Sequence, residues 1–260
     1  MRPTDHDPYA TIAPFYDLAT AGFDEDLLLY RELARRSGSV LELGVGTGRV
    51  ARALAREGHR VTGIDRSAAM LRLAYQRARE EGVEIALLRG EMAAPPLRAR
   101  FGLLICALNG FLHLARPGEQ AAALRVWRTL LAPRGVLVLD LPGPGGDWSE
   151  WNPGARPLAL DWTRPLGDAL VTRLSTFVAD PAAQTRYHTD IFDVVERDGT
   201  VRRYQTAYPL RYVFPEEMLL LLERAGLQLR GRYGGYDLDP FTSASERMII
   251  VAERGRRSPA

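Results

Sequence analysis

Three glycines at alternate positions follow a short apolar run near the start of the chain, and this arrangement restricts the fold more than any other feature. The run covers residues 40–43 and is apolar except for Glu42, and the glycines are Gly44, Gly46 and Gly48. Residues 50–55 then continue with apolar side chains at helical spacing. A strand, a tight turn and a helix in this order are typical of nucleotide-binding sites, because glycine lets the backbone turn sharply and approach a ligand closely.

The spacing of these glycines indicates which ligand the turn accepts. A dinucleotide-binding turn has the spacing G-x-G-x-x-G, which places a pyrophosphate at the N-terminus of the helix. Here the spacing is G-x-G-x-G, and Glu42 stands just before the turn. A carboxylate at that position repels a pyrophosphate and suits a ligand that carries an ammonium group.

Asp65 stands at the end of the second strand, which we expect over residues 60–65. A carboxylate at this place can accept hydrogen bonds from both hydroxyls of a ribose, as the acid does in dinucleotide-binding folds. The alternative is a surface or helix-capping role for Asp65. Ser67 is also suited to the N-cap of the helix expected over residues 67–81.

At these residues the sequence resembles the class I S-adenosylmethionine-dependent methyltransferases, whose first motif is an acidic residue followed by G-x-G-x-G. The resemblance implies S-adenosyl-L-methionine as the cofactor, with its amino-acid end at the acid and the glycines of the turn and its ribose at Asp65. It places the adenine beside Glu91 and Met92, although the family more often has Asp where this chain has Glu91, and a solvent-facing Glu91 is the alternative. The other expected cofactor contacts are Tyr9, Tyr16, Arg66, Met70 and Leu108.

Strand and helix patterns alternate over residues 38–140, which predicts an α/β fold with a doubly wound parallel sheet. Strands are expected near residues 38–43, 60–65, 84–88, 101–106 and 134–140, and helices near residues 24–35, 47–57, 67–81 and 117–131. The resemblance implies a Rossmann-like methyltransferase fold with seven mostly parallel strands. A helix from Pro215 to Gly226 and an antiparallel hairpin of residues 228–233 and 247–253 are expected to complete it.

Residues 158–213 show no helical period and predict an inserted antiparallel sheet. Its strands are expected at residues 161–164, 169–179, 185–196 and 201–213. In the last two strands, aromatic and aliphatic residues alternate with polar ones, which predicts one wet face and one covered face. The apolar positions are Tyr187, Ile191, Val195, Tyr204, Tyr208 and Tyr212. Either the substrate or a second subunit is expected to cover them.

These patterns divide the chain into four regions. The expected regions are an N-terminal lid and helix (residues 1–36), a cofactor-binding core (residues 37–145 and 214–253), the inserted sheet for acceptor selection or dimerisation (residues 146–213) and a disordered tail (residues 254–260).

Asn109, His113 and Tyr16 are the candidates for contact with the methyl acceptor. Asn109 and His113 follow the fourth strand in a largely apolar segment, as polar groups often do in small-ligand pockets. The Leu-His-Leu segment resembles the segment that faces the acceptor in sugar N-methyltransferases. The Tyr-x-x-x-Ala-x-x-Tyr-Asp pattern of residues 9–17 resembles the N-terminal segment of small-molecule methyltransferases, which implies that Tyr9 and Tyr16 close over the cofactor and substrate. With an ordinary pKa near 6.5, His113 could take a proton from an amine acceptor. The alternatives are that Asn109 is only a turn residue and that His113 is a hydrogen-bonded structural histidine. Tyr9 and Tyr16 would then only dock the N-terminal segment on the body of the domain.

The resemblance implies methyl transfer from S-adenosylmethionine to a small molecule, either to an amine or to a hydroxyl of a sugar or secondary metabolite. A non-catalytic S-adenosylmethionine-binding protein is one alternative. A nucleotide-dependent oxidoreductase is another, but the glycine spacing and the closing hairpin argue against it.

Composition narrows the expected partners and location. The net charge is only +2 and the arginines form no run, so we expect no nucleic-acid partner. The single cysteine, Cys106, excludes an internal disulfide and a cysteine-only metal site, and no metal is expected. The absence of a disulfide fits a reducing cytoplasm. No apolar run approaches the roughly 20 residues that a bilayer requires, so no membrane partner is expected.

Overall fold

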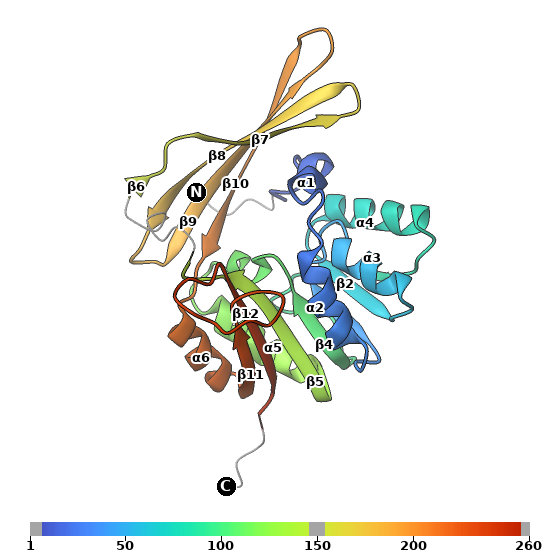
Figure 1. Cartoon of the computed structure of the whole chain (residues 1–260), viewed down its shortest axis with the longest axis vertical. Coiled ribbons are helices and arrows are strands. Elements are labelled where there is room, and N and C mark those ends of the chain that lie inside the picture. Colours follow the sequence, from blue (N-terminus) through green and yellow to red (C-terminus); the bar gives the residue numbers. More distant parts are fainter. Residues whose placement is uncertain (1–6, 146–153, 256–260) are drawn as a thin grey trace.

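The computed structural model describes residues 7–145 and 154–255, and it has a seven-stranded sheet at its centre. The strand order is β11-β12-β5-β4-β1-β2-β3 (Figure 1). Strands β3, β2, β1, β4 and β5 run parallel, while β12 is antiparallel to β5 and to β11. The expected Rossmann-like methyltransferase fold is therefore confirmed.

The strands of this sheet agree closely with the expected ones. They are β1 (Val40–Leu43), β2 (Val61–Asp65), β3 (Ala86–Arg89), β4 (Phe101–Cys106), β5 (Leu131–Pro142), β11 (Leu227–Tyr233) and β12 (Arg247–Arg254). All four residues of β1 are buried. A strand that is buried on both faces is largely apolar in sequence, and β1 is apolar except for Glu42.

Helices cover both faces of the main sheet. They are α2 (Glu25–Ala34), α3 (Arg49–Arg56), α4 (Ala68–Glu80), α5 (Glu119–Leu130) and α6 (Pro215–Arg224). One core cluster joins α5 and α6 to the sheet around Trp127 and Met218. A second joins α2 and α3 to it around Tyr30 and Leu54. No helix in the described ranges is long and apolar enough to cross a membrane.

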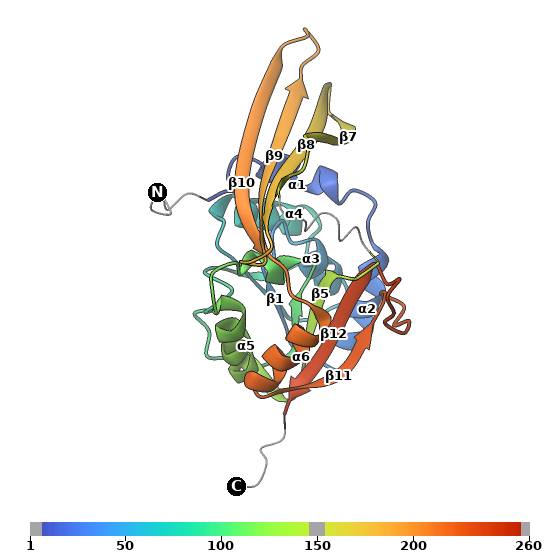
Figure 2. The ribbon, with the colours of Figure 1, turned by 90° about the vertical axis from the view of Figure 1, so that its left-hand side faces the viewer.

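A separate antiparallel sheet follows β5 and extends away from the main body (Figure 2). Its strands are β6 (Gly154–Ala155), β7 (Ala159–Leu166), β8 (Ala169–Asp180), β9 (Thr185–Val195) and β10 (Val201–Arg211). The order is β10-β9-β8-β6, and β7 also pairs with β8. This confirms the expected inserted sheet.

The short N-terminal helix α1 (Ala13–Ala19) packs against one face of the inserted sheet. Phe15 stacks on Phe192 of β9, with ring centroids 5.4 Å apart. The sequence pattern does not predict this helix, which is only seven residues long. Short helices depend on tertiary contacts for their stability, and such contacts are not visible in a local pattern.

The strand register corrects the expected division of the inserted sheet into a wet face and an apolar face. Tyr208 lies opposite His188, and Tyr187 lies opposite Pro209. Successive side chains of a strand point to opposite faces, so Tyr208 and Tyr187 are on different faces. The expectation that these tyrosines share one covered face is wrong. The alternation within each strand shows which residues of that strand share a face, but it does not show how the two strands are aligned with each other.

Some expectations concern residues outside the described ranges. These are residues 1–6 of the expected lid, residues 146–153 of the expected insert, and residues 256–260 of the expected disordered tail. Arg254, at the start of that tail, is the last residue of β12.

Candidate cofactor and acceptor site

The glycine turn between β1 and α3 has a backbone that favours glycine at all three positions. The φ angles are 75° at Gly44, 54° at Gly46 and 80° at Gly48, a region that residues with a Cβ rarely adopt. A Cβ on Gly44 would lie 3.6 Å from the Met92 sulfur, and a Cβ on Gly46 would lie 3.8 Å from Cε1 of Tyr16. Met92 and Tyr16, both expected cofactor contacts, therefore face the turn.

Asp65 holds the glycine turn at the end of β2. Its Oδ2 accepts a hydrogen bond from the Gly46 N–H and its Oδ1 accepts one from the Ser67 N–H, each at 2.9 Å. Burial raises the pKa of Asp65, and the two backbone donors oppose that shift. The cap of α4 is Ser67, whose Oγ accepts from the Met70 N–H. Each Asp65 oxygen keeps acceptor capacity for a ribose hydroxyl.

Glu42 is a buried acid without a full set of partners. It is 4% exposed, and its Oε2 has no hydrogen-bond partner among the described residues. Burial raises its pKa to about 8, although Arg49 nearby opposes the shift. Arg49 is itself paired with Asp26, at 2.7 and 2.5 Å. A buried oxygen without a partner is unfavourable, so Glu42 fits a ligand that brings an ammonium group.

The expected adenine contacts lie after β3 in different surroundings. Met92 is partly buried against the core, and its carbonyl oxygen accepts a 2.6 Å hydrogen bond from Nε1 of Trp127, which fixes this loop. The Glu91 side chain is 63% exposed and lies 3.9 Å from Arg66. An adenine contact by Glu91 or Arg66 therefore stays a prediction. Met70 is buried in a cluster that includes Tyr16.

Tyr9 connects the N-terminal segment with the loop after β4. Its hydroxyl lies 3.0 Å from Nε2 and 3.2 Å from Nδ1 of His113. Its ring lies edge-on to Tyr16, at 6.2 Å, and stacks on Tyr208 of β10, at 5.8 Å. His188 of β9 stacks on the same Tyr208 at 5.8 Å. We call Tyr9, Tyr16, His113, His188 and Tyr208 the aromatic cluster.

Both histidines of the aromatic cluster are neutral at pH 7. Burial lowers the pKa of His113 to about 4, with a further contribution from the charge of Arg66. Burial and the charge of Arg186 lower the pKa of His188 to about 3. The expectation that His113 titrates near 6.5 is therefore wrong, because it assumed a solvated imidazole.

A buried acid supports the aromatic cluster from the inserted sheet. Asp190 accepts a 2.8 Å hydrogen bond from the Tyr208 hydroxyl and a 3.0 Å bond from Nη2 of Arg173. Because Asp190 is 2% exposed, these bonds fix the Tyr208 ring in place. The sequence pattern did not indicate His188, Asp190 or Arg173 as site residues, and it placed Tyr208 only among positions that either the substrate or a second subunit would cover. Finding them requires the register of β9 and β10.

Asn109 belongs to a second polar group at the rim. Its Oδ1 accepts a 2.9 Å hydrogen bond from Nη2 of Arg247, which pairs with the buried Asp140. Asp140 also accepts from the Leu108 N–H at 3.0 Å and from the Tyr236 hydroxyl at 3.1 Å. Leu108 and Asn109 have positive φ angles, 42° and 63°. The structure thus ties the Asn109 side chain to Arg247, and an acceptor contact by Asn109 stays a prediction.

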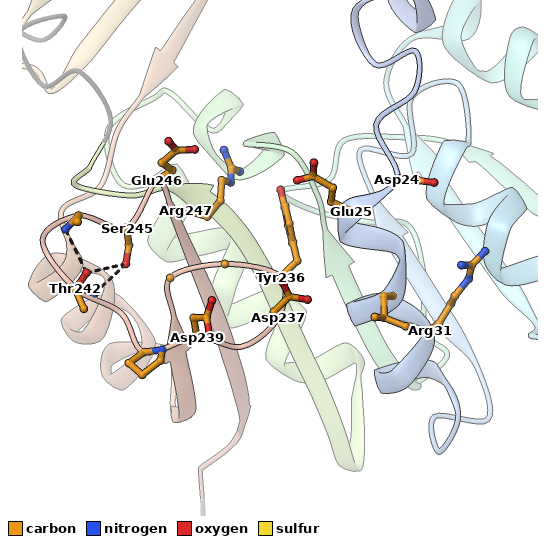
Figure 3. A pocket seen from close by; sticks show the side chains of 15 residues that line it. Asp24, Glu25, Arg31, Tyr236, Asp237, Asp239, Thr242, Ser245, Glu246 and Arg247 are labelled. Atoms are coloured by element: carbon orange, nitrogen blue, oxygen red, sulfur yellow. Dashed lines mark hydrogen bonds between the residues drawn. The ribbon is translucent and has the colours of Figure 1, made fainter.

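A cavity of about 710 Å³ lies on the other side of Arg247 and Tyr236. Figure 3 shows that its walls come from the first turns of α2 and from the loop between β11 and β12. Its lining includes neither the glycine turn nor Asp65, and it includes none of the aromatic cluster. The residues that the sequence predicts for the cofactor therefore lie outside this cavity.

Comparisons with known proteins show which family the chain resembles. A family model described as a methyltransferase domain matches residues 40–135. The dTDP-3-amino-3,6-dideoxy-alpha-D-glucopyranose N,N-dimethyltransferase of Streptomyces fradiae is 31% identical over 232 residues, which cover 86% of each chain. The cypemycin N-terminal methyltransferase of a Streptomyces species is 29% identical over 217 residues, or 83% of each chain.

Solved structures show the same similarity over the whole fold. The CcbJ methyltransferase from Streptomyces caelestis matches with a TM-score of 0.80 and 30% identity. The match covers 97% of this chain and 99% of that one. The similarity therefore includes the inserted sheet as well as the main sheet.

Proposed function

The chain belongs to the class I S-adenosylmethionine-dependent methyltransferases, and we propose that it transfers the methyl group to an amine of a small molecule, such as an amino sugar or a related secondary metabolite. The contact between Tyr9 and His113 carries this proposal most directly. It places a neutral imidazole among aromatic rings and against Tyr9, whose ring lies edge-on to Tyr16, the tyrosine that faces the glycine turn.

The residues at the carboxyl ends of β1 and β2 are assigned to the cofactor. Bound S-adenosylmethionine supplies a methyl group that its sulfonium already activates. Glu42 has the unpartnered buried oxygen that an ammonium group would satisfy. Asp65 and the backbone of the glycine turn hold the ribose and the amino-acid end. Met92, which faces Gly44, covers the adenine.

The aromatic cluster is assigned to the acceptor. A neutral His113 can accept a hydrogen bond from an amine N–H, and it does not repel a cationic cofactor. With a pKa of about 4, His113 is too weak a base to deprotonate an ammonium ion efficiently. The amine therefore reacts after binding in its neutral form, and His113 orients its lone pair toward the methyl group.

The protonation states favour an amine over a hydroxyl as the acceptor. A hydroxyl must lose its proton as it attacks, which requires a base of suitable pKa. The two imidazoles are weak bases, and burial raises the pKa of the Tyr208 phenol. The buried Asp190 is already occupied by Arg173 and Tyr208. A neutral amine attacks with its own lone pair and releases its proton to water afterwards.

The names of two relatives support the same choice. One is an N,N-dimethyltransferase named for a 3-amino sugar nucleotide, and the other is an N-terminal methyltransferase. In both names the methyl group goes to an amine. For the present chain an amino sugar is therefore the first acceptor class to test.

The test uses S-adenosylmethionine with a labelled methyl group and pairs of acceptors that differ only by an amine or a hydroxyl at one carbon. We expect label in the amino member of a pair, with mass spectrometry placing the methyl on nitrogen. A methyl on oxygen would contradict the amine assignment. Tight S-adenosylmethionine binding without transfer to any acceptor would favour a non-catalytic binding protein.

A further inference from the structure

Two buried oxygen atoms near the glycine turn have no hydrogen-bond partner among the described residues. One is Oε2 of Glu42 on β1, and the other is the hydroxyl oxygen of Tyr30 on α2. Tyr30 is 0% exposed, so its hydroxyl is out of contact with bulk solvent. Buried polar groups in native proteins usually have a partner, which is the protein itself, an ordered water or a ligand. Glu42 has a proposed role at the cofactor, and Tyr30 has none.

Glu42 and Tyr30 lie on the same side of the main sheet. Val40 and Glu42 share one face of β1, because successive side chains of a strand point to opposite sides. Val40 packs in the core cluster of α2 and α3, whereas its neighbour Leu41 packs in the cluster of α5 and α6. Tyr30 and Val45 of the glycine turn belong to the same cluster as Val40. Helix α2 packs against α3, which follows the glycine turn in the chain (Figure 1).

The charged groups around the Tyr30 hydroxyl are mainly acids. Burial raises the pKa of the phenol well above its usual value, and the nearby carboxylates of Asp140, Asp26 and Glu42 raise it further. The phenol is therefore protonated and neutral at pH 7. Asp26 and Asp140 are each paired with an arginine, whereas Glu42 forms no ion pair with the residues that the structure describes. One unbalanced acid beside a neutral hydroxyl favours a cation over an anion.

An ammonium group matches both oxygens without partners. It carries N–H donors and no acceptor, while a carboxylate oxygen and a phenol oxygen both have lone pairs to accept them. A buried cation is stable only when it is paired and its donors are hydrogen-bonded. Glu42 can supply the opposite charge and accept one donor, but a further acceptor is needed for a second donor. The Tyr30 hydroxyl is such an acceptor.

A metal ion and a carboxylate group fit this place less well. The described part of the chain contains no group of three or more His, Cys, Asp or Glu side chains that could hold a metal ion. A carboxylate could accept the phenol proton of Tyr30, but the three nearby acids would repel it. The amino-acid end of S-adenosylmethionine carries both a carboxylate and an ammonium group, and the ammonium group is the one that these surroundings favour.

We propose that Tyr30 is a cofactor-binding residue and that its hydroxyl accepts a hydrogen bond from the ammonium group of S-adenosylmethionine beside Glu42. This inference rests on the proposed function, because it requires the cofactor to bind at the glycine turn. It extends the cofactor site to α2, which precedes the turn in the chain. The hydroxyl then has a partner only in the complex, so Tyr30 weakens the ligand-free protein and strengthens the bound one.

Replacing Tyr30 by phenylalanine tests both halves of this statement. Tyr30→Phe removes one oxygen atom and keeps the ring in the core. The unfolding temperature of the ligand-free variant should rise, because a buried hydroxyl without a partner is lost. Its affinity for S-adenosylmethionine should fall by about 10-fold to 100-fold, as expected for a lost hydrogen bond to a charged group. Tyr75→Phe is the matched control and should change neither quantity, because Tyr75 is 56% exposed on α4.

Calorimetry with three ligands identifies the group that Tyr30 binds. S-adenosylmethionine has an ammonium group and a carboxylate, decarboxylated S-adenosylmethionine keeps the ammonium group alone, and methylthioadenosine lacks both. Tyr30→Phe should weaken the binding of the first two ligands and leave the affinity for methylthioadenosine unchanged.

Three results would overturn the proposal. They are equal affinity of the wild type and Tyr30→Phe for S-adenosylmethionine, a loss that is absent with decarboxylated S-adenosylmethionine, and an equal loss with methylthioadenosine. The second result would assign Tyr30 to the carboxylate, and the third would show a general distortion of the site. A wild-type protein that binds none of the three ligands would instead refute the proposed function itself.

Discussion

Replacing Gly46 by alanine separates the two reasons for glycine in this turn, namely the backbone conformation and the space for the ligand. The φ angle of Gly46 is 54°, so alanine has a backbone cost of about 1–2 kcal/mol. No protein atom adds to this cost, because the nearest neighbour of a new Cβ is Tyr16 at 3.8 Å. Gly58 is the matched control: its φ angle is 84° and a Cβ there has no neighbour within 4 Å.

We expect Gly46→Ala and Gly58→Ala to lower the free energy of unfolding of the ligand-free protein by similar amounts. Only Gly46→Ala should weaken S-adenosylmethionine binding. An added methyl group in a close contact costs about 1–3 kcal/mol, which is a loss of roughly 5-fold to 150-fold in affinity. Denaturant unfolding measures the first quantity and isothermal titration calorimetry the second. Wild-type affinity in Gly46→Ala, or an equal loss in Gly58→Ala, would refute the placement of the cofactor at this turn.

Three further substitutions test the site. Glu42→Gln should stabilise the ligand-free protein at pH 9 by at most about 5 kcal/mol. The pKa of Glu42 rises from 4.5 to about 8 on folding, so the stability of the wild-type protein falls as pH rises through that window. The same substitution should weaken S-adenosylmethionine binding, and unchanged affinity would mean that Glu42 does not face the cofactor. Asp65→Ala should weaken cofactor binding by about 10-fold to 100-fold, since hydrogen bonds to a charged acceptor contribute about 1.5–3 kcal/mol. It should also destabilise the glycine turn, because Asp65 accepts the Gly46 N–H. Calorimetry measures the affinity and thermal unfolding of the same sample measures the stability. His113→Asn should lower turnover by less than about 100-fold, because loss of a general base usually costs at least that much. The variant should also keep any inflection of the rate near pH 6.5. A larger fall that removes such an inflection would show that His113 acts as a base.

The residues proposed for the cofactor could be identified from the sequence because their determinants are local. Glu42, the three glycines and Asp65 lie within two consecutive strand–turn units, and the apolar strands that carry them are buried and easily recognised. The backbone conformation of the turn requires glycine, so the sequence records the geometry directly. What the local pattern did not show is that Asp65 also holds the Gly46 N–H.

The acceptor side could be predicted only in part because it depends on contacts between distant segments. His113 meets Tyr9 across 104 positions of the sequence. His188 and Tyr208 reach the aromatic cluster because β9 and β10 pair in one particular register, and a shift by one residue would turn them to the opposite face of the sheet. The pKa of His113 likewise follows from burial, which the sequence of its own loop does not determine.

A crystal structure with S-adenosylhomocysteine and the best amine acceptor tests the central claim most directly, because two separate places at the rim could receive a small molecule. We expect the acceptor nitrogen within hydrogen-bond distance of His113, between the glycine turn and the face of the inserted sheet that carries Tyr208. An acceptor bound instead in the cavity lined by α2 and the loop between β11 and β12, beyond Tyr236 and Arg247 (Figure 3), would contradict it.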